Sequence, residues 1–272
     1  MAERAFRFSV GIHSVKSRTA LQDKVKRLED SGFDALHLPD HLGAPAPFPA
    51  LTAIASATST VRLGTYVLNA GFYKPALLAR DAGEVDALSD GRLDLGLGAG
   101  YVREEFEAAE LPYPTARQRV DYLEHVTTYL KKHLPTVPIL IAGNGNRLLT
   151  VAAQHADIIG LTGASSGDAA DPLAERVEFV REAAGGRFAD LELNLAITAV
   201  PSDNSGKPDL TLTRRFVDSS DEQLLALPSV LSGSPGDIAD TLRGYREKYG
   251  LTSFTFQENH VDTIAKVIAA LR

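Results

Sequence analysis

A histidine and an aspartate stand side by side at Asp40 and His41, directly after a short apolar run. An imidazole can donate or accept a hydrogen bond and can pass a proton near pH 7. His41 is therefore a candidate for contact with a heteroaromatic ring and for proton transfer, with Asp40 as the group that orients it. The alternative is that Asp40 caps the following loop and His41 packs beneath it.

A second candidate is a glycine-rich turn between an apolar run and a helical stretch. Backbone N–H groups at such a helix start, together with the helix dipole, bind anions, and a neighbouring arginine suits phosphate. The alternative is a left-handed turn followed by an asparagine cap. The pattern favours a phosphate site made of Gly143, Asn144, Gly145, Asn146 and Arg147.

Glycines recur at alternate positions from Gly96 to Gly100, a spacing that differs from the dinucleotide-binding fingerprint. Because glycine has no Cβ, Gly98 and Gly100 could let a flat ring lie against the main chain. The alternative is that small residues merely fill the interior of the fold, and Gly96 could serve only that purpose.

Further polar and aromatic side chains follow other apolar runs. Tyr101 could stack beside a ring, and Glu104 or Glu105 could donate a proton, although both carboxylates also suit the first turn of a helix. Glu258 belongs to a polar segment that could meet substrate or simply cap the last helix. Thr162 stands directly after another apolar run.

These candidates are separated by a regular alternation of eight short apolar runs with amphipathic helical stretches. Such alternation predicts a parallel sheet, and eight units favour closure into a single (β/α)8 barrel, with a doubly wound open sheet as the alternative. We expect one domain over residues 1–272, with functional residues at the carboxyl ends of the strands. The expected strands are residues 6–12, 35–39, 61–68, 92–97, 138–142, 157–161, 191–200 and 253–257.

Bulk composition narrows the class of protein. The net charge is −7 and no long basic run occurs, which argues against a nucleic-acid surface. The absence of cysteine excludes disulfides and thiol nucleophiles. We find no signal peptide at the N-terminus and no apolar stretch that could span a membrane, so we expect a cytoplasmic protein without membrane partners.

With these segments in place, the chain resembles the bacterial luciferase-like monooxygenase superfamily, and within it the branch of coenzyme F420-dependent oxidoreductases. Each matching motif is weak alone, but their order and spacing are specific. The matching segments are residues 32–36, 39–41, 61–65, 88–92, 97–101, 143–153, 156–157 and 232–235.

The resemblance implies a ring cofactor across the barrel mouth, with F420 as the expected cofactor and FMN as the alternative. In deazaflavin members a bulge with a non-proline cis peptide supports the ring, and the matching positions here are Tyr66 and Val67, next to Thr65. The resemblance also matches His41 to the family's histidine and the Gly143 turn to its phosphate region. Where some sugar-oxidising relatives place a catalytic glutamate, this chain has Tyr101, which argues against sugar-phosphate oxidation.

The expected reaction is hydride transfer between the reduced deazaflavin and an unsaturated C=C or C=N bond of a small molecule or peptide, such as dehydroalanine in a modified peptide. The alternatives are an FMN-dependent monooxygenase and a non-catalytic ligand-binding barrel. By the same resemblance we expect a homodimer. The residues expected to act in catalysis are His41, Asp40, Glu104 and Glu258.

Overall fold

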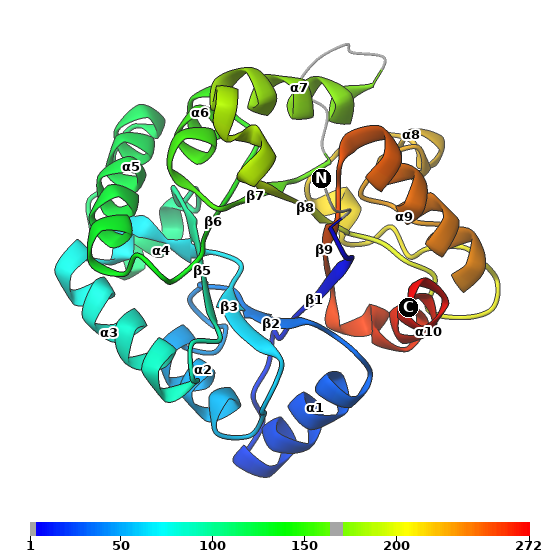
Figure 1. Ribbon diagram of the computed structural model, residues 1–272, viewed down its shortest axis with the longest axis horizontal. Helices are drawn as coiled ribbons and strands as arrows, with labels where there is room; N and C mark the ends of the chain where they lie inside the picture. The colour runs from blue at the N-terminus through cyan, green and yellow to red at the C-terminus, as the bar shows by residue number, and fades with distance from the viewer. Residues whose placement is uncertain (1–3, 164–170) are drawn as a thin grey trace.

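The computed structural model describes residues 4–163 and 171–272. Within these residues the strands form one parallel sheet in the order β3-β2-β1-β9-β8-β7-β6-β5-β4, and a further pairing of β3 with β5 closes it. Because β3 and β4 are two parts of one interrupted strand, the sheet is the expected (β/α)8 barrel (Figure 1). The strands are β1 Arg7–Gly11, β2 Ala35–Leu38, β3 Arg62–Thr65, β4 Leu68–Asn69, β5 Leu93–Gly98, β6 Ile139–Ala142, β7 Ile158–Leu161, β8 Glu192–Ala196 and β9 Ser253–Phe256.

Helices surround the barrel and cover the outward faces of its strands (Figure 1). Several of them begin at a side-chain cap that satisfies an otherwise unpaired amide: Ser17 accepts from Ala20, and Thr115 and Ser234 each form a capping box. The helices are α1 Arg18–Asp30, α2 Pro47–Ala55, α3 Pro75–Leu88, α4 Arg103–Ala108, α5 Ala116–His133, α6 Asn146–His155, α7 Pro172–Ala184, α8 Asp221–Leu225, α9 Pro235–Tyr249 and α10 Val261–Leu271. None of the described helices is both long and apolar enough to cross a membrane.

The strand expected at residues 61–68 is interrupted by a bulge. Gly64 pairs with Asp94, and Leu68 pairs with Leu97. Between these two pairings, β3–β4 therefore contains one residue more than β5, which defines the bulge. The non-proline cis peptide expected from the family resemblance lies in this bulge, between Tyr66 and Val67.

Thr65 and Gly96 hold the bulge to β5. The Thr65 hydroxyl donates to the carbonyl of Gly96 at 2.7 Å and accepts from its amide at 2.9 Å, which replaces the ladder bonds that the bulge interrupts. A Cβ at position 96 would lie 1.9 Å from the carbonyl oxygen of Thr65, so only glycine fits there.

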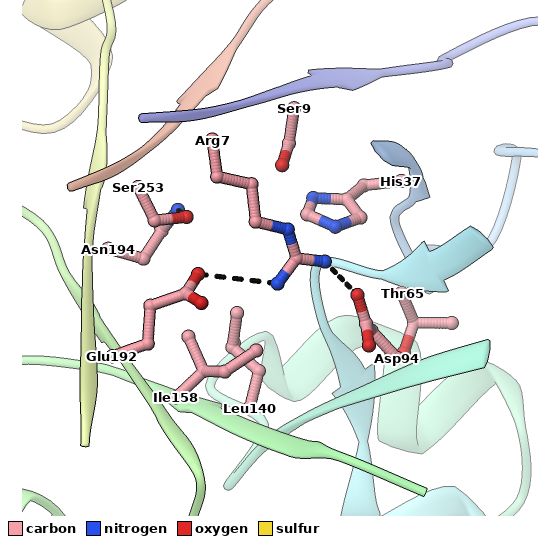
Figure 2. Close-up of a pocket in the computed structure, with 10 residues that line it drawn as sticks. All are labelled: Arg7, Ser9, His37, Thr65, Asp94, Leu140, Ile158, Glu192, Asn194 and Ser253. Atoms are coloured by element: carbon pink, nitrogen blue, oxygen red, sulfur yellow. Dashed lines mark hydrogen bonds and ion pairs between the residues drawn. The ribbon is translucent and has the colours of Figure 1, made fainter. Parts of the chain in front are cut away.

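The inward-facing side chains near the amino ends of the strands are charged. Arg7 lies between the carboxylates of Asp94 and Glu192 (Figure 2). Arg62 also binds Asp94. The space among these side chains is too small to admit a water molecule. This end of the barrel interior is therefore a packed, ion-paired plug.

Candidate functional site

His41 and Glu105 meet at the carboxyl ends of the strands. The His41 Nδ1 atom lies 2.9 Å and 3.2 Å from the two carboxylate oxygens of Glu105, and the amide of Leu42 donates to the same carboxylate at 3.2 Å. Because an ionised carboxylate only accepts, the Nδ1 atom of His41 carries a proton and donates it to Glu105. The ring of Tyr101 stands edge-on to the imidazole at 6.3 Å.

Asp40 makes different contacts from those expected. Its carboxylate accepts from the amide of Asn69 at 3.0 Å and from the hydroxyl of Tyr73. Burial raises the pKa of Asp40 above its ordinary value, against the opposing effect of these hydrogen bonds. The expectation that Asp40 orients His41 is therefore wrong in its contact: Glu105 holds the imidazole, and Asp40 ties its own strand to β4.

The side chains of Glu104 and Glu105, which are consecutive in α4, point in different directions. Phe106 is buried and packs against Phe72 and Tyr113, which fixes the rotation of this short helix. Glu105 then points to His41 and is only 15% exposed, whereas Glu104 is exposed to solvent. The structure therefore brings Glu105 to His41, rather than Glu104, the expected catalytic residue.

The glycines of β5 face the bulge. A Cβ on Gly98 would lie 2.8 Å from the Val67 side chain, and one on Gly100 would lie 2.2 Å from the Asn69 side chain. Gly100 also has a φ of +71°, which favours glycine. These glycines let β3–β4 approach β5. That their missing Cβ atoms also make room for a flat ring stays a prediction. Thr65, at 1% exposed, is likewise committed to the barrel wall.

Tyr66 anchors the bulge from inside the barrel. Its hydroxyl donates to Asn194 Oδ1 at 2.9 Å, and its ring stacks on His37 with centroids 5.5 Å apart and planes 10° apart. Burial and the nearby Arg7 cation lower the pKa of His37 to about 4, so its ring is neutral at pH 7. His37 lies within β2, and nothing local in the sequence marks its contact with Tyr66.

The glycine-rich turn leads into α6 as expected. Gly145 is the residue before the helix, Asn146 is its first residue, and among the described residues no side chain caps this start. Asn146 is therefore not a helix cap. Arg147 forms an ion pair with Asp121 of α5 rather than reaching back over the turn. Asn144 and Thr162, which follow β6 and β7, are both half-buried.

Glu258 follows β9, which is separated from β2 only by β1 in the sheet order. Its carboxylate pairs with Lys24 of α1 at 2.5 Å and accepts from the amide of His13 at 3.4 Å. The His13 ring in turn lies 2.9 Å from Gln257 Oε1. These contacts join β9 to the segment after β1, which gives Glu258 a structural partner in addition to its place at the mouth.

A separate hollow of about 600 Å³ opens at the amino ends of the strands. Its lining includes Arg4, Phe6, Phe33, Asp34, Arg62 and Arg272. In a (β/α)8 barrel the chemistry is done at the other face. We therefore take the cluster around His41, rather than this hollow, as the candidate site.

Comparisons with known proteins identify the family and the fold that this chain resembles. A family model described as luciferase-like monooxygenase matches residues 5–207. The chain is 31% identical over 157 residues to a 5,10-methylenetetrahydromethanopterin reductase of Archaeoglobus fulgidus, which covers 50% of this chain and 47% of that protein. It is also 34% identical over 123 residues to an F420-dependent glucose-6-phosphate dehydrogenase of Intrasporangium calvum, and this match covers 41% of this chain and 37% of that protein. The matched segments thus span less than half of either relative.

The fold also matches a solved structure over nearly its whole length. The coenzyme F420-dependent tetrahydromethanopterin reductase of Methanopyrus kandleri superposes with a TM-score of 0.80, over 99% of this chain and 100% of that one, at 16% identity. At this identity the likeness concerns the fold.

Proposed function

Because the chain belongs to the luciferase-like monooxygenase family, we propose that it is an oxidoreductase that binds coenzyme F420 at the carboxyl ends of its strands. The observation that carries the proposal is the bulge at Tyr66 and Val67, where the Tyr66 amide donates to the carbonyl of Leu38 at the carboxyl end of β2, three residues before His41. Similarity to an F420-dependent dehydrogenase supports the choice of cofactor. The bulge would lie beneath the ring, and the start of α6 would hold its phosphate.

The local charge at the start of α6 favours a deazaflavin over FMN. Arg147 is paired with Asp121. Arg176 of α7 pairs with Glu175 through Nη2 but keeps a buried Nε without a partner among the described residues, so it is the one incompletely satisfied arginine that the described contacts place at this helix start. Backbone amides and a helix dipole suit a phosphate with one negative charge. F420 carries a phosphodiester with a single charge, whereas FMN carries a phosphomonoester with up to two.

When bound, the deazaflavin would donate or accept a hydride, and the protein would supply alignment and a proton. His41, held through Nδ1 by Glu105, keeps Nε2 free to contact a ring or relay a proton. We propose as substrate an unsaturated C=C or C=N bond in a small molecule or peptide, on the side of the mouth where Tyr101 is 67% exposed. Glu104 and Glu258 remain candidates for contact with that substrate.

Parallel titrations of the purified protein with F420 and with FMN, followed by fluorescence, test this proposal. We expect saturable F420 binding at least about tenfold tighter than FMN binding. The rival is an FMN-dependent monooxygenase on the same scaffold. Yellow FMN retained through purification, without measurable affinity for F420, would establish the rival and reject our proposal.

A further inference from the structure

A buried arginine from α7 reaches the first residue of α6. Arg176 is 6% exposed, and its Nη1 atom donates to Asn146 Oδ1 at 2.5 Å. The two residues are 30 positions apart in the chain, so no local motif joins them. The guanidinium also lies 5.2 Å from the ring of Phe179, which fixes its plane from the other side.

The guanidinium is not fully satisfied. Nη2 pairs with Glu175, but Nε is buried and has no hydrogen-bond partner in the described part of the chain. A buried donor without an acceptor is costly and rare in folded proteins. Arg176 therefore has donor capacity that the described contacts leave unused, at the start of a helix whose own amides face outward.

The contact with Arg176 also decides which way the Asn146 amide faces. A guanidinium only donates, so the Asn146 atom beside it must be the carbonyl oxygen. The Nδ2 group of Asn146, with two donors, is then turned away from the arginine. Asn146 itself is exposed, so these donors are accessible from outside the helix start.

The residue before the helix leaves this surface open. A Cβ at Gly145 would meet nothing within 4 Å, and its φ of −71° suits any residue. Neither packing nor backbone geometry requires glycine at this position. A ligand that approaches the helix start closely is a physical reason for the absence of a side chain.

We propose that Arg176 is the cationic side chain of the phosphate subsite: it fixes the Asn146 amide as a donor to the phosphate and compensates the phosphate charge from below. The inference deepens the proposed function, because the phosphate is that of the cofactor. Arg147, the arginine that the sequence pattern favours, is committed to Asp121 instead. Arg176 is thus a positioning residue for Asn146 and the electrostatic partner of the anion.

The test isolates the phosphate from the ring. Dissociation constants are measured by fluorescence for F420 and for the deazaflavin riboside that lacks phosphate, and their ratio gives the gain in affinity due to the phosphate. In Arg176→Gln we expect this gain to fall about tenfold, while the affinity for the riboside stays unchanged. The matched control, Arg147→Gln, should change the gain by less than about twofold, because that arginine is exposed and already paired.

Asn146→Asp keeps the test decisive if Arg176→Gln does not fold. The new carboxylate can pair with Arg176, so the melting temperature should hold or rise, while the loss of the Nδ2 donors and the added charge should remove the gain due to the phosphate. An undiminished gain in both variants would overturn the role of Arg176 and leave the cofactor assignment intact. Failure of wild-type protein to bind either deazaflavin would overturn the proposed function, and the inference with it.

Discussion

The charged side chains at the two ends of the barrel interior differ in how they are paired and exposed. At the amino end, Arg7 contacts Asp94 and Glu192 in a space that admits no water (Figure 2), and Arg62 shares the carboxylate of Asp94. At the carboxyl end, one carboxylate holds His41 through Nδ1, and the side chain of His41 is 46% exposed. The first cluster pairs its charges in a space without room for water, whereas the second leaves the imidazole accessible.

Two histidines near the end of β2 show the same contrast. His37 is buried, stacks on Tyr66, and has an Nδ1 atom without a partner among the residues described. The side chain of His41 is 46% exposed and bound to Glu105. Depth in the barrel, rather than residue type, separates a histidine that supports the wall from one that can exchange a proton.

Removal of Asp94, at the amino end of the barrel, should have the largest effect on stability. Asp94→Ala leaves Arg7 and Arg62 without their shared carboxylate inside the barrel, and loss of one partner from a buried ion pair costs about 3–5 kcal/mol. We expect the free energy of unfolding, measured by urea denaturation, to fall by that amount.

Asp121→Ala is the matched control for Asp94→Ala, because Asp121 belongs to an exposed arginine–carboxylate pair. Its expected cost is under about 1 kcal/mol. Equal losses in the two variants would mean that the interior cluster is no more consequential than a surface pair.

Changes at the mouth should affect turnover and spare stability. His41→Ala removes the imidazole held by Glu105, and loss of a group that relays a proton costs about 100-fold in kcat. Because His41 is nearly half exposed, the melting temperature should barely move. Steady-state kinetics with F420 and thermal melting give the two readouts.

Glu105→Gln should share the loss of turnover, because an amide holds the imidazole less firmly than a carboxylate does. Glu258→Gln is the control at the same face, with its carboxylate bound to Lys24. Parallel losses of activity and stability in His41→Ala would mean that the imidazole is structural. A larger loss in Glu258→Gln than in Glu105→Gln would move the chemistry to the segment after β9.

The barrel and the position of its mouth follow from local patterns. Strand and helix periodicity are properties of neighbouring residues, and parallel strands bring all of their carboxyl ends to one face. For this reason His41, Tyr101 and the Gly143 turn could be placed on that face before any contact was known. The cis peptide position came from the family resemblance instead.

The contacts that decide roles are long-range, and they could not be read in this way. Glu105 and His41 are 64 residues apart, and the preference for Glu105 over Glu104 depends on how Phe106 packs. The repeated glycines of β5 are visible in the sequence, but the structural reason for them is a bulge on another strand. Arg176 has no local signal at all, because a helical arginine usually faces solvent.

The smallest expected effect is a change in the pH dependence of stability. Burial lowers the pKa of His37 and of His260 to about 4, from 6.5. The unfolded chain therefore binds more protons than the folded protein between about pH 4 and 6.5, and stability falls as the pH falls through that window. Above pH 6.5 the contribution is fully present. Over the 1.5 units from pH 6.5 to 5, His37 alone should cost about 2 kcal/mol.

His37→Phe isolates this contribution while keeping a ring against Tyr66. Urea denaturation of both proteins at pH 7 and pH 5 gives the two losses of stability. The variant should lose about 2 kcal/mol less than wild type on acidification, because it lacks the depressed pKa of His37 and keeps that of His260. Identical losses would mean that His37 binds a proton as readily in the folded protein as in the unfolded chain, because the protonated ring gains a partner inside the barrel.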